Sequence, residues 1–169
     1  YKQFIPGNTY FVRMSRLVFP PSYQYFQDTL HLCIGSPVDN DECLGAIALN
    51  IDTVFTPHWF SNALSTPTVP TSSCMNVDFD YDVWFKFIAR SSYHRVEVEG
   101  GYYQFGEIFE SCGGEKIACF QEELLSPKAI AELHNLQIGS TYYIQLASGD
   151  PASVHDSFSI CILDAPQTD

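Results

Sequence analysis

The stretch that decides the fold is GSTYYIQLA, from Gly139 to Ala147, where a glycine precedes a run rich in β-branched and aromatic residues. Such a run, bounded by a turn residue, predicts a β-strand. An earlier stretch, GNTYFVRM from Gly7 to Met14, has the same pattern at an offset of 132 residues, counted from Gly7 to Gly139. The chain therefore contains one motif of turn and strand twice.

A second match follows each of these stretches. QDTLHLCI, residues 27–34, matches HDSFSICI, residues 155–162, with an aspartate, a hydroxyl residue and a cysteine in the same order. We infer part of a tandem array, although two hairpins can also be similar by chance. The predicted division is a β-hairpin at 1–37, a complete module at 38–166 and a linker at 167–169. The hairpin either ends a preceding repeat or consists of strands exchanged with a neighbour.

Between these matches the chain is a succession of β-rich segments separated by Gly, Pro, Ser, Asn or Asp. This pattern predicts an all-β domain, a two-sheet β-sandwich of jelly-roll or Greek-key type. Residues 52–73, rich in Thr, Ser and Pro, are predicted to form a long surface loop. We expect Val83, Phe85 and Phe87 in the core and Trp84 on the other face of their strand. The remaining strand candidates are GAIALNI (45–51), DVWFKFIA (82–89), HRVEVEG (94–100), GEIFES (106–111), KIACF (116–120) and IAELHN (130–135).

Charge and hydrophobicity exclude several kinds of partner. The chain has 20 acidic and 8 basic residues, and its net charge of −12 repels nucleic acids and anionic lipids. Hydrophobic residues make up 46% of the chain, which argues against disorder. No apolar run reaches the roughly 20 residues of a membrane helix. We therefore expect a folded domain that binds no nucleic acid and does not insert into a membrane.

The six cysteines favour disulfides and an extracellular location, because no CxxC motif or histidine cluster suggests zinc. We predict that Cys112 pairs with Cys119 across the turn GGEKIA. We also predict that Cys43 pairs with Cys74 and closes the proline-rich loop. The other two cysteines are either buried thiols, which we favour, or a bond between stacked units. They are Cys33 and Cys161.

Two acidic stretches, DNDEC at 39–43 and DFDYDVW at 78–84, are candidates for a cation site. Carboxylates that converge without cationic partners are held most easily by Ca²⁺, which takes about six to eight oxygen ligands. The alternative is a solvated acidic face, because neither stretch has the spacing of an EF-hand. The candidate calcium ligands are Asp41, Glu42, Asp80 and Asp82.

Sequence signatures of catalysis are missing, because the histidines are scattered and neither GxSxG nor HExxH occurs. We therefore expect no enzyme activity. Aromatic residues are better candidates for function, since an aromatic ring stacks on the apolar face of a sugar. Trp59, in the predicted loop, and Tyr102 and Tyr103, after two glycines, are candidates for a carbohydrate-binding platform. The alternative is that these rings pack in the core.

Five motifs occur along the chain in this order: NDECLGAIAL (40–49), the isolated Cys74, DVWFKF (82–87), GEIFESCGGEKIACF (106–120) and LQIGSTYYIQL (136–146). In that order they resemble the repeated β-sandwich modules of large secreted and surface proteins of Bacteroidota. These modules are relatives of pre-peptidase C-terminal and CUB-like jelly rolls. The resemblance covers about residues 38–165 and implies a spacer, adhesive unit or carbohydrate binder in proteins exported by the type IX system. It supports a bond between Cys112 and Cys119 and is compatible with calcium at Asp41 and Asp82.

Two triplets, DTL at Asp28 and DTV at Asp52, resemble the sites at which Bacteroidota attach O-linked glycans to exported proteins, and they implicate Thr29 and Thr53. The function we expect is a structural and adhesive repeat module of a long extracellular, cell-surface or fibre-forming protein. Its expected partners are neighbouring copies of the module and, in addition, glycans. The alternative is a carbohydrate-binding module of a secreted multidomain enzyme.

Overall fold

The computed structural model describes residues 7–13, 38–63, 65–66, 81–100, 104–122, 126, 128–148 and 157–164. The chain divides into two units, Tyr1–Ile34 and Gly35–Asp169. In the first unit the described residues begin with a turn at Gly7 but form no strand, although the pattern predicted one there. The rest of the predicted hairpin, and the linker 167–169, lie outside the described residues, so the predicted division stays a prediction.

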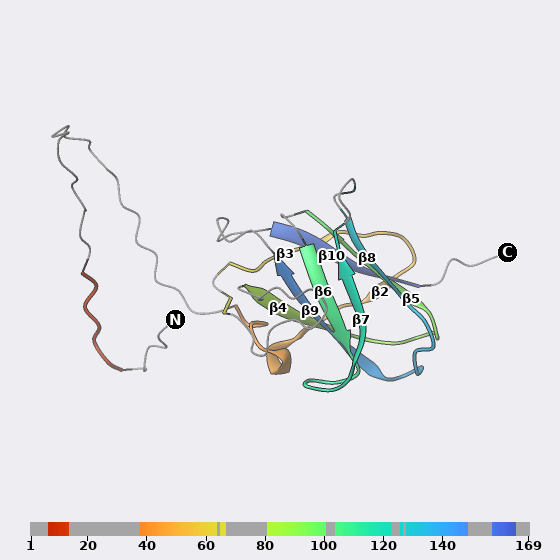
Figure 1. Ribbon diagram of the computed structural model, residues 1–169, viewed down its shortest axis with the longest axis horizontal. Coiled ribbons are helices and arrows are strands. Elements are labelled where there is room, and N and C mark those ends of the chain that lie inside the picture. The colour runs from red at the N-terminus through yellow and green to blue at the C-terminus, as the bar shows by residue number, and fades with distance from the viewer. Residues whose placement is uncertain are drawn as a thin grey trace. The chain divides into compact units, whose positions relative to one another are not determined.

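The second unit is built from strands and one short 3₁₀ helix in the part that the structure describes (Figure 1). Turn residues separate the strands, as the sequence predicted. In chain order the elements are η1 (Cys43–Gly45), β1 (Ile47–Ala48), β2 (Ile51–Asp52), β3 (His58–Ser61), β4 (Asp82–Ile88), β5 (His94–Glu99), β6 (Gln104–Phe109), β7 (Lys116–Gln121), β8 (Lys128–Leu133), β9 (Thr141–Ser148) and β10 (Ser157–Asp164).

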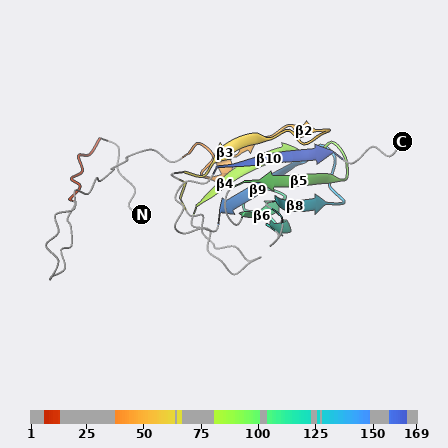
Figure 2. The same ribbon diagram turned by 90° about the horizontal axis from the view of Figure 1, so that it is seen from above.

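The strands form two sheets that pack face to face (Figure 2). Sheet A has the order β1-β4-β9-β6-β7, and sheet B has the order β2-β10-β5-β8 with β3 also paired to β10. β1 and β2 run parallel to their neighbours β4 and β10, and the other pairs are antiparallel. From β4 onward the chain passes from one sheet to the other at every connection except the β6–β7 hairpin. These crossings are typical of jelly rolls and Greek keys, and the predicted all-β sandwich is confirmed.

The core lies between the two sheets and follows the alternation of the sequence. Val83, Phe85 and Phe87 of β4 are 0, 0 and 1% exposed, which confirms that they point into the sandwich. The ring of Phe85 lies 6.0 Å from that of Phe158 on β10 and 4.8 Å from that of Phe60 on β3, both in edge-on contacts. Such aromatic contacts add about 0.5–1.5 kcal/mol each to the burial of the rings. These contacts tie sheet A to sheet B.

Two parts of the chain differ from the prediction. The single strand expected at 45–51 is divided, because β1 pairs with β4 in sheet A while β2 pairs with β10 in sheet B. The segment between them, Leu49–Asn50, therefore carries the chain from one sheet to the other. The loop expected at 52–73 contains β3, which forms because Phe60 buries its ring against the core. Four residues within a stretch rich in Thr and Pro gave too short a pattern to predict this strand.

Candidate functional site

The acidic stretch at 39–43 is packed against sheet A by hydrogen bonds. The backbone N–H of Trp84 donates to the carbonyl of Asn40 at 2.8 Å, and Asn40 Nδ2 donates to the carbonyl of Trp84 at 3.1 Å. Asp41 is 7% exposed and accepts hydrogen bonds from the backbone N–H and, at 2.8 Å, the hydroxyl of Thr66. Neutral donors therefore hold the Asp41 carboxylate in a fixed position, while Glu42 is exposed.

Asp82 begins β4 and is completely buried. Its Oδ2 accepts a hydrogen bond from Gln145 Nε2 of β9 at 3.0 Å. Asp80, the fourth candidate calcium ligand, lies outside the described residues. Among the residues that the structure describes, no three His, Cys, Asp or Glu side chains converge so as to hold a metal ion. The calcium site stays a prediction. Of its candidate ligands, Asp41 and Asp82 are buried and accept hydrogen bonds from Thr66 and Gln145 respectively.

The outer face of sheet A, which points away from the core, is covered over part of its area. A row of paired residues, Trp84, Gln145 and Glu107, crosses β4, β9 and β6, and each is at most 5% exposed. The ring of Trp84 lies 5.6 Å from the ring of Phe109, and Glu107 forms an ion pair with Lys116 at 3.3 Å. Trp84 therefore covers the second face of the sheet, as the sequence suggested. It is not available for stacking on a ligand.

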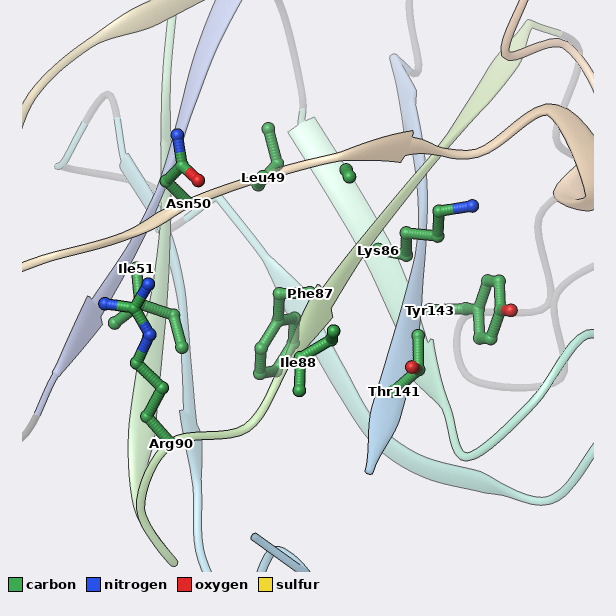
Figure 3. Close-up of a pocket in the computed structure, with 10 residues that line it drawn as sticks. Leu49, Asn50, Ile51, Lys86, Phe87, Ile88, Arg90, Thr141 and Tyr143 are labelled. Atoms are coloured by element: carbon green, nitrogen blue, oxygen red, sulfur yellow. The ribbon is translucent and has the colours of Figure 1, made fainter. Parts of the chain in front are cut away.

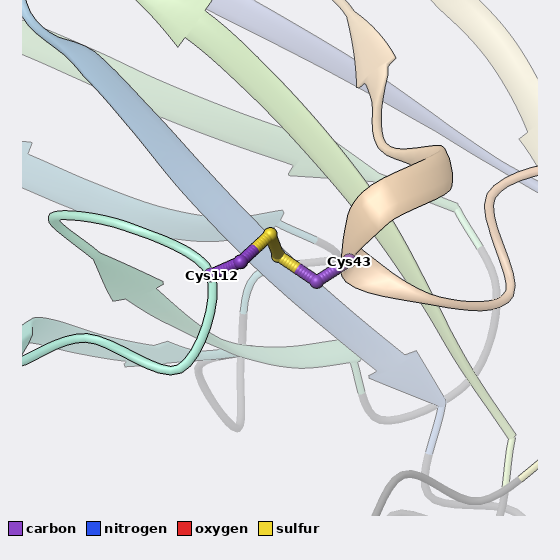
Figure 4. Close-up of a disulfide and its surroundings, with 2 residues drawn as sticks. All are labelled: Cys43 and Cys112. Atoms are coloured by element: carbon purple, nitrogen blue, oxygen red, sulfur yellow. A yellow bond between two sulfur atoms is a disulfide. The ribbon is translucent and has the colours of Figure 1, made fainter.

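A disulfide joins Cys43 of η1 to Cys112 in the β6–β7 turn, with a Cα–Cα distance of 5.7 Å (Figure 4). The predicted pairs Cys112–Cys119 and Cys43–Cys74 are therefore wrong. In the β6–β7 hairpin Cys119 pairs with Glu107, five residues before Cys112. At about 3.3 Å per residue this separation is well beyond the roughly 7 Å that a disulfide spans. The hairpin register thus excludes the bond that the turn sequence had suggested.

Cys119 is disulfide-bonded too. Cys161 is a buried free thiol, as favoured from the sequence. Its Sγ lies 3.6 Å from Asp52 Oδ2. Burial raises the pKa of the Cys161 thiol, so the thiol stays protonated and unreactive in the fold. The other cysteine predicted to be a buried thiol, Cys33, lies outside the described residues.

The candidate sugar-binding residue Trp59 lies on β3 and is 65% exposed. Since Phe60 points into the core, alternation places Trp59 on the outer face of sheet B, in a row with Ser159 and Glu99. A Cβ built at Gly100, where φ is +85°, would lie 3.3 Å from Trp59 Cζ3. The indole ring therefore packs on a position where only a glycine fits easily. Its predicted companions, Tyr102 and Tyr103, lie outside the described residues.

A charged network on the same face of sheet B escaped the sequence analysis. Lys128 of β8 forms ion pairs with Glu99 and, at 3.6 Å, with Glu97, and its ammonium lies 5.0 Å from the centre of the Phe55 ring. The hydrogen bond to Glu99 raises the pKa of Lys128. Arg95 Nε lies 2.8 Å from Glu97 Oε1. The alternating charges of HRVEVE were a signal for this polar face.

One of the two candidate glycosylation sites can be placed. Thr53 follows β2 and is exposed, while Thr29 lies outside the described residues. Glycosylation at either position stays a prediction. Within the described residues, no helix is long and apolar enough to cross a membrane.

The two packed sheets define a β-sandwich domain. Residues 39–160 match the model of a T9SS-associated family that is described as galactose-binding-domain-like, and they make up more than half of the chain. The chain belongs to this family. No curated protein sequence matches it. Membership supports the type IX resemblance, and with it a domain of a secreted or cell-surface protein.

Proposed function

We propose that the domain is a non-catalytic, load-bearing and adhesive module of a secreted or surface protein. The observation that carries the proposal is the position of the Cys43–Cys112 bond. It joins the first turn of the module to the β6–β7 turn, with a sequence separation of 69 residues. A force that enters before Cys43 passes through the bond to Cys112, so it does not stretch the chain between them. About 240 Å of chain is thereby protected, at roughly 3.5 Å per residue.

Tandem repetition is part of this proposal and is supported by a detail of the backbone. Gly7 and Gly139, which the internal match aligns, have φ angles of +85° and +84°. This left-handed conformation favours glycine, so both copies of the motif begin with the same turn geometry. Repetition of the module, the closer likeness to pre-peptidase C-terminal and CUB-like modules, and fibre formation with neighbouring copies belong to the proposal.

Stretching the full chain between handles at its two ends would test the proposal. One sample keeps the Cys43–Cys112 bond, and the other carries Cys43→Ser and Cys112→Ser. Both carry Cys119→Ser, so that no other bond limits extension. We expect the length released on unfolding to be about 240 Å greater without the bond. Equal release in both samples would mean that the bond does not lie in the path of force, and the load-bearing role would be refuted.

A carbohydrate-binding module is the second candidate, and the exposed ring of Trp59 favours it. The ring packs on Gly100 and stands beside Ser159 on a polar sheet face, an arrangement that suits stacking on a sugar. A glycan array probed with the full chain and with Trp59→Ala would test this candidate. Because Trp59 is 65% exposed, the substitution should leave folding intact. Signals that are equal for both proteins, or silence of the array, would remove Trp59 as a binding residue.

A further inference from the structure

The basic side chains of the second unit fall into two groups. Three of them pair with acids: Arg95 with Glu97, Lys116 with Glu107, and Lys128 with Glu97 and Glu99. The other two form no ion pair within the described part of the chain, although the protein carries 20 acidic residues. The two unpaired cations are Lys86 and Arg90.

Both unpaired cations line one groove, whose volume is about 440 Å³ (Figure 3). This volume lies within the range of about 300–1,000 Å³ that is typical of small-ligand sites. Lys86 and Arg90 lie on opposite sides of Phe87 and Ile88 in this view. Ile88 is 58% exposed, and Phe87 is buried beneath it in the core. The groove therefore combines an apolar floor with a positive charge at each end.

The register of sheet A explains why these residues meet. Lys86 pairs with Tyr143 and Ile88 pairs with Thr141, so the four side chains stand together on the outer face of β4 and β9. Along β4, Lys86 and Ile88 follow Trp84, so this part of the outer face lies next to the buried row of Trp84, Gln145 and Glu107. Leu49 and Asn50, which connect β1 to β2, form one wall of the groove. The backbone N–H of Leu49 donates a hydrogen bond to the carbonyl of Lys86 at 2.8 Å and so holds this wall beside β4.

We propose that this groove binds a short saccharide that carries carboxylates. Lysine and arginine bind carboxylates through charge-assisted hydrogen bonds, so two cations in one groove suit a ligand that carries more than one carboxylate. The ring of Tyr143 and the side chain of Ile88 offer apolar surface for the C–H faces of the sugar, and Thr141 and Asn50 offer partners for its hydroxyls. The net charge of −12 repels long, densely charged polymers, which favours a short ligand. The site is separate from Trp59 and does not depend on the load-bearing role.

Titration of the full chain with digalacturonate, followed by amide chemical shifts, would test the proposal. The methyl ester of the same disaccharide keeps the rings and removes the charges, and it is the matched control ligand. Lys86→Gln and Arg90→Gln each remove one cation from the groove, and each should weaken binding by about tenfold. Arg13→Gln is the control variant, because Arg13 is an exposed cation of the other unit and its loss changes the net charge equally.

Binding of digalacturonate that shifts the amides of residues 86–90 and 141–143, weakens with salt and is lost with the ester would support the proposal. Equal binding of the ester would refute it without any variant. So would full affinity in both groove variants, or no binding at all. Tighter binding of an acidic peptide than of digalacturonate would also overturn it, because the groove would then recognise protein carboxylates.

Discussion

The Cys43–Cys112 bond should be a main source of stability. A bond that closes a loop of 69 residues lowers the entropy of the unfolded chain, and the loop-closure relation gives a stabilisation of about 4 kcal/mol. We therefore expect the double substitution Cys43→Ser and Cys112→Ser to lower the free energy of unfolding by about that amount. It should also steepen the denaturant dependence, because the unfolded chain becomes more expanded.

Urea unfolding followed by tryptophan fluorescence would measure this change. Trp84 is 4% exposed beside Phe109 and reports on the sheet face that the bond crosses. The disulfide of Cys119 constrains the unfolded chain as well. The comparison is therefore best made between Cys119→Ser and the variant that carries Cys43→Ser, Cys112→Ser and Cys119→Ser together. A loss below about 1 kcal/mol, with an unchanged denaturant dependence, would refute the loop-closure argument.

Three further predictions follow from buried groups. Acid should weaken the fold through His94, because burial lowers the pKa of its imidazole and its Nε2 accepts two backbone hydrogen bonds. The stabilising contribution of the neutral ring is therefore complete above pH 6.5 and decreases below it. Urea titrations of His94→Gln should lack this part of the pH slope, and an identical slope would contradict the assignment. The Cys161 thiol should react with a thiol reagent only after unfolding, so rapid labelling of the native protein would show that the strand opens. Gly106→Ala should lower the free energy of unfolding by at least about 2 kcal/mol, since the added Cβ would lie 2.5 Å from Phe120 Cζ and 2.7 Å from the Gln145 carbonyl oxygen. An unchanged melting temperature would contradict this prediction, because the sheet would then have adjusted to the added methyl group at little cost.

The longer strands could be predicted because local pattern and tertiary burial agree in them. In β4, Val83, Phe85 and Phe87 alternate with Trp84 and Lys86, which predicts that the three share one face of the strand, and the sandwich buries that face. The division between β1 and β2 could not be predicted, since a hydrophobic pattern gives no sign of which sheet a short strand joins. β3 was missed for a related reason, as its stability comes from the contact between Phe60 and Phe85.

The candidate sites were predictable by residue type and much less by arrangement. Trp59 could be singled out as an aromatic residue in a polar stretch, and it is exposed on a sheet face. The disulfide pairs could not be deduced, because they depend on where η1 lies on sheet A. The groove at Lys86 and Arg90 could not be predicted, because it depends on the register of β4 with β9 and on the ion pairs that Arg95, Lys116 and Lys128 form elsewhere.

The pairing at the edges of the two sheets limits how copies of this domain can associate. Along β10, one margin is occupied by β5 and the other by two short segments, β2 and β3. On the opposite side of the domain, an isolated bridge between Glu122 and Ala129 links the strands of the two sheets. Exposed edge strands are the usual templates for intermolecular β-sheet growth, and short or covered edges resist it. A neighbour that adds a strand beside β10 must therefore displace β2 or β3, whereas contact through side chains and loops leaves the fold unchanged. Assembly by the second route would let each domain fold before it meets the next.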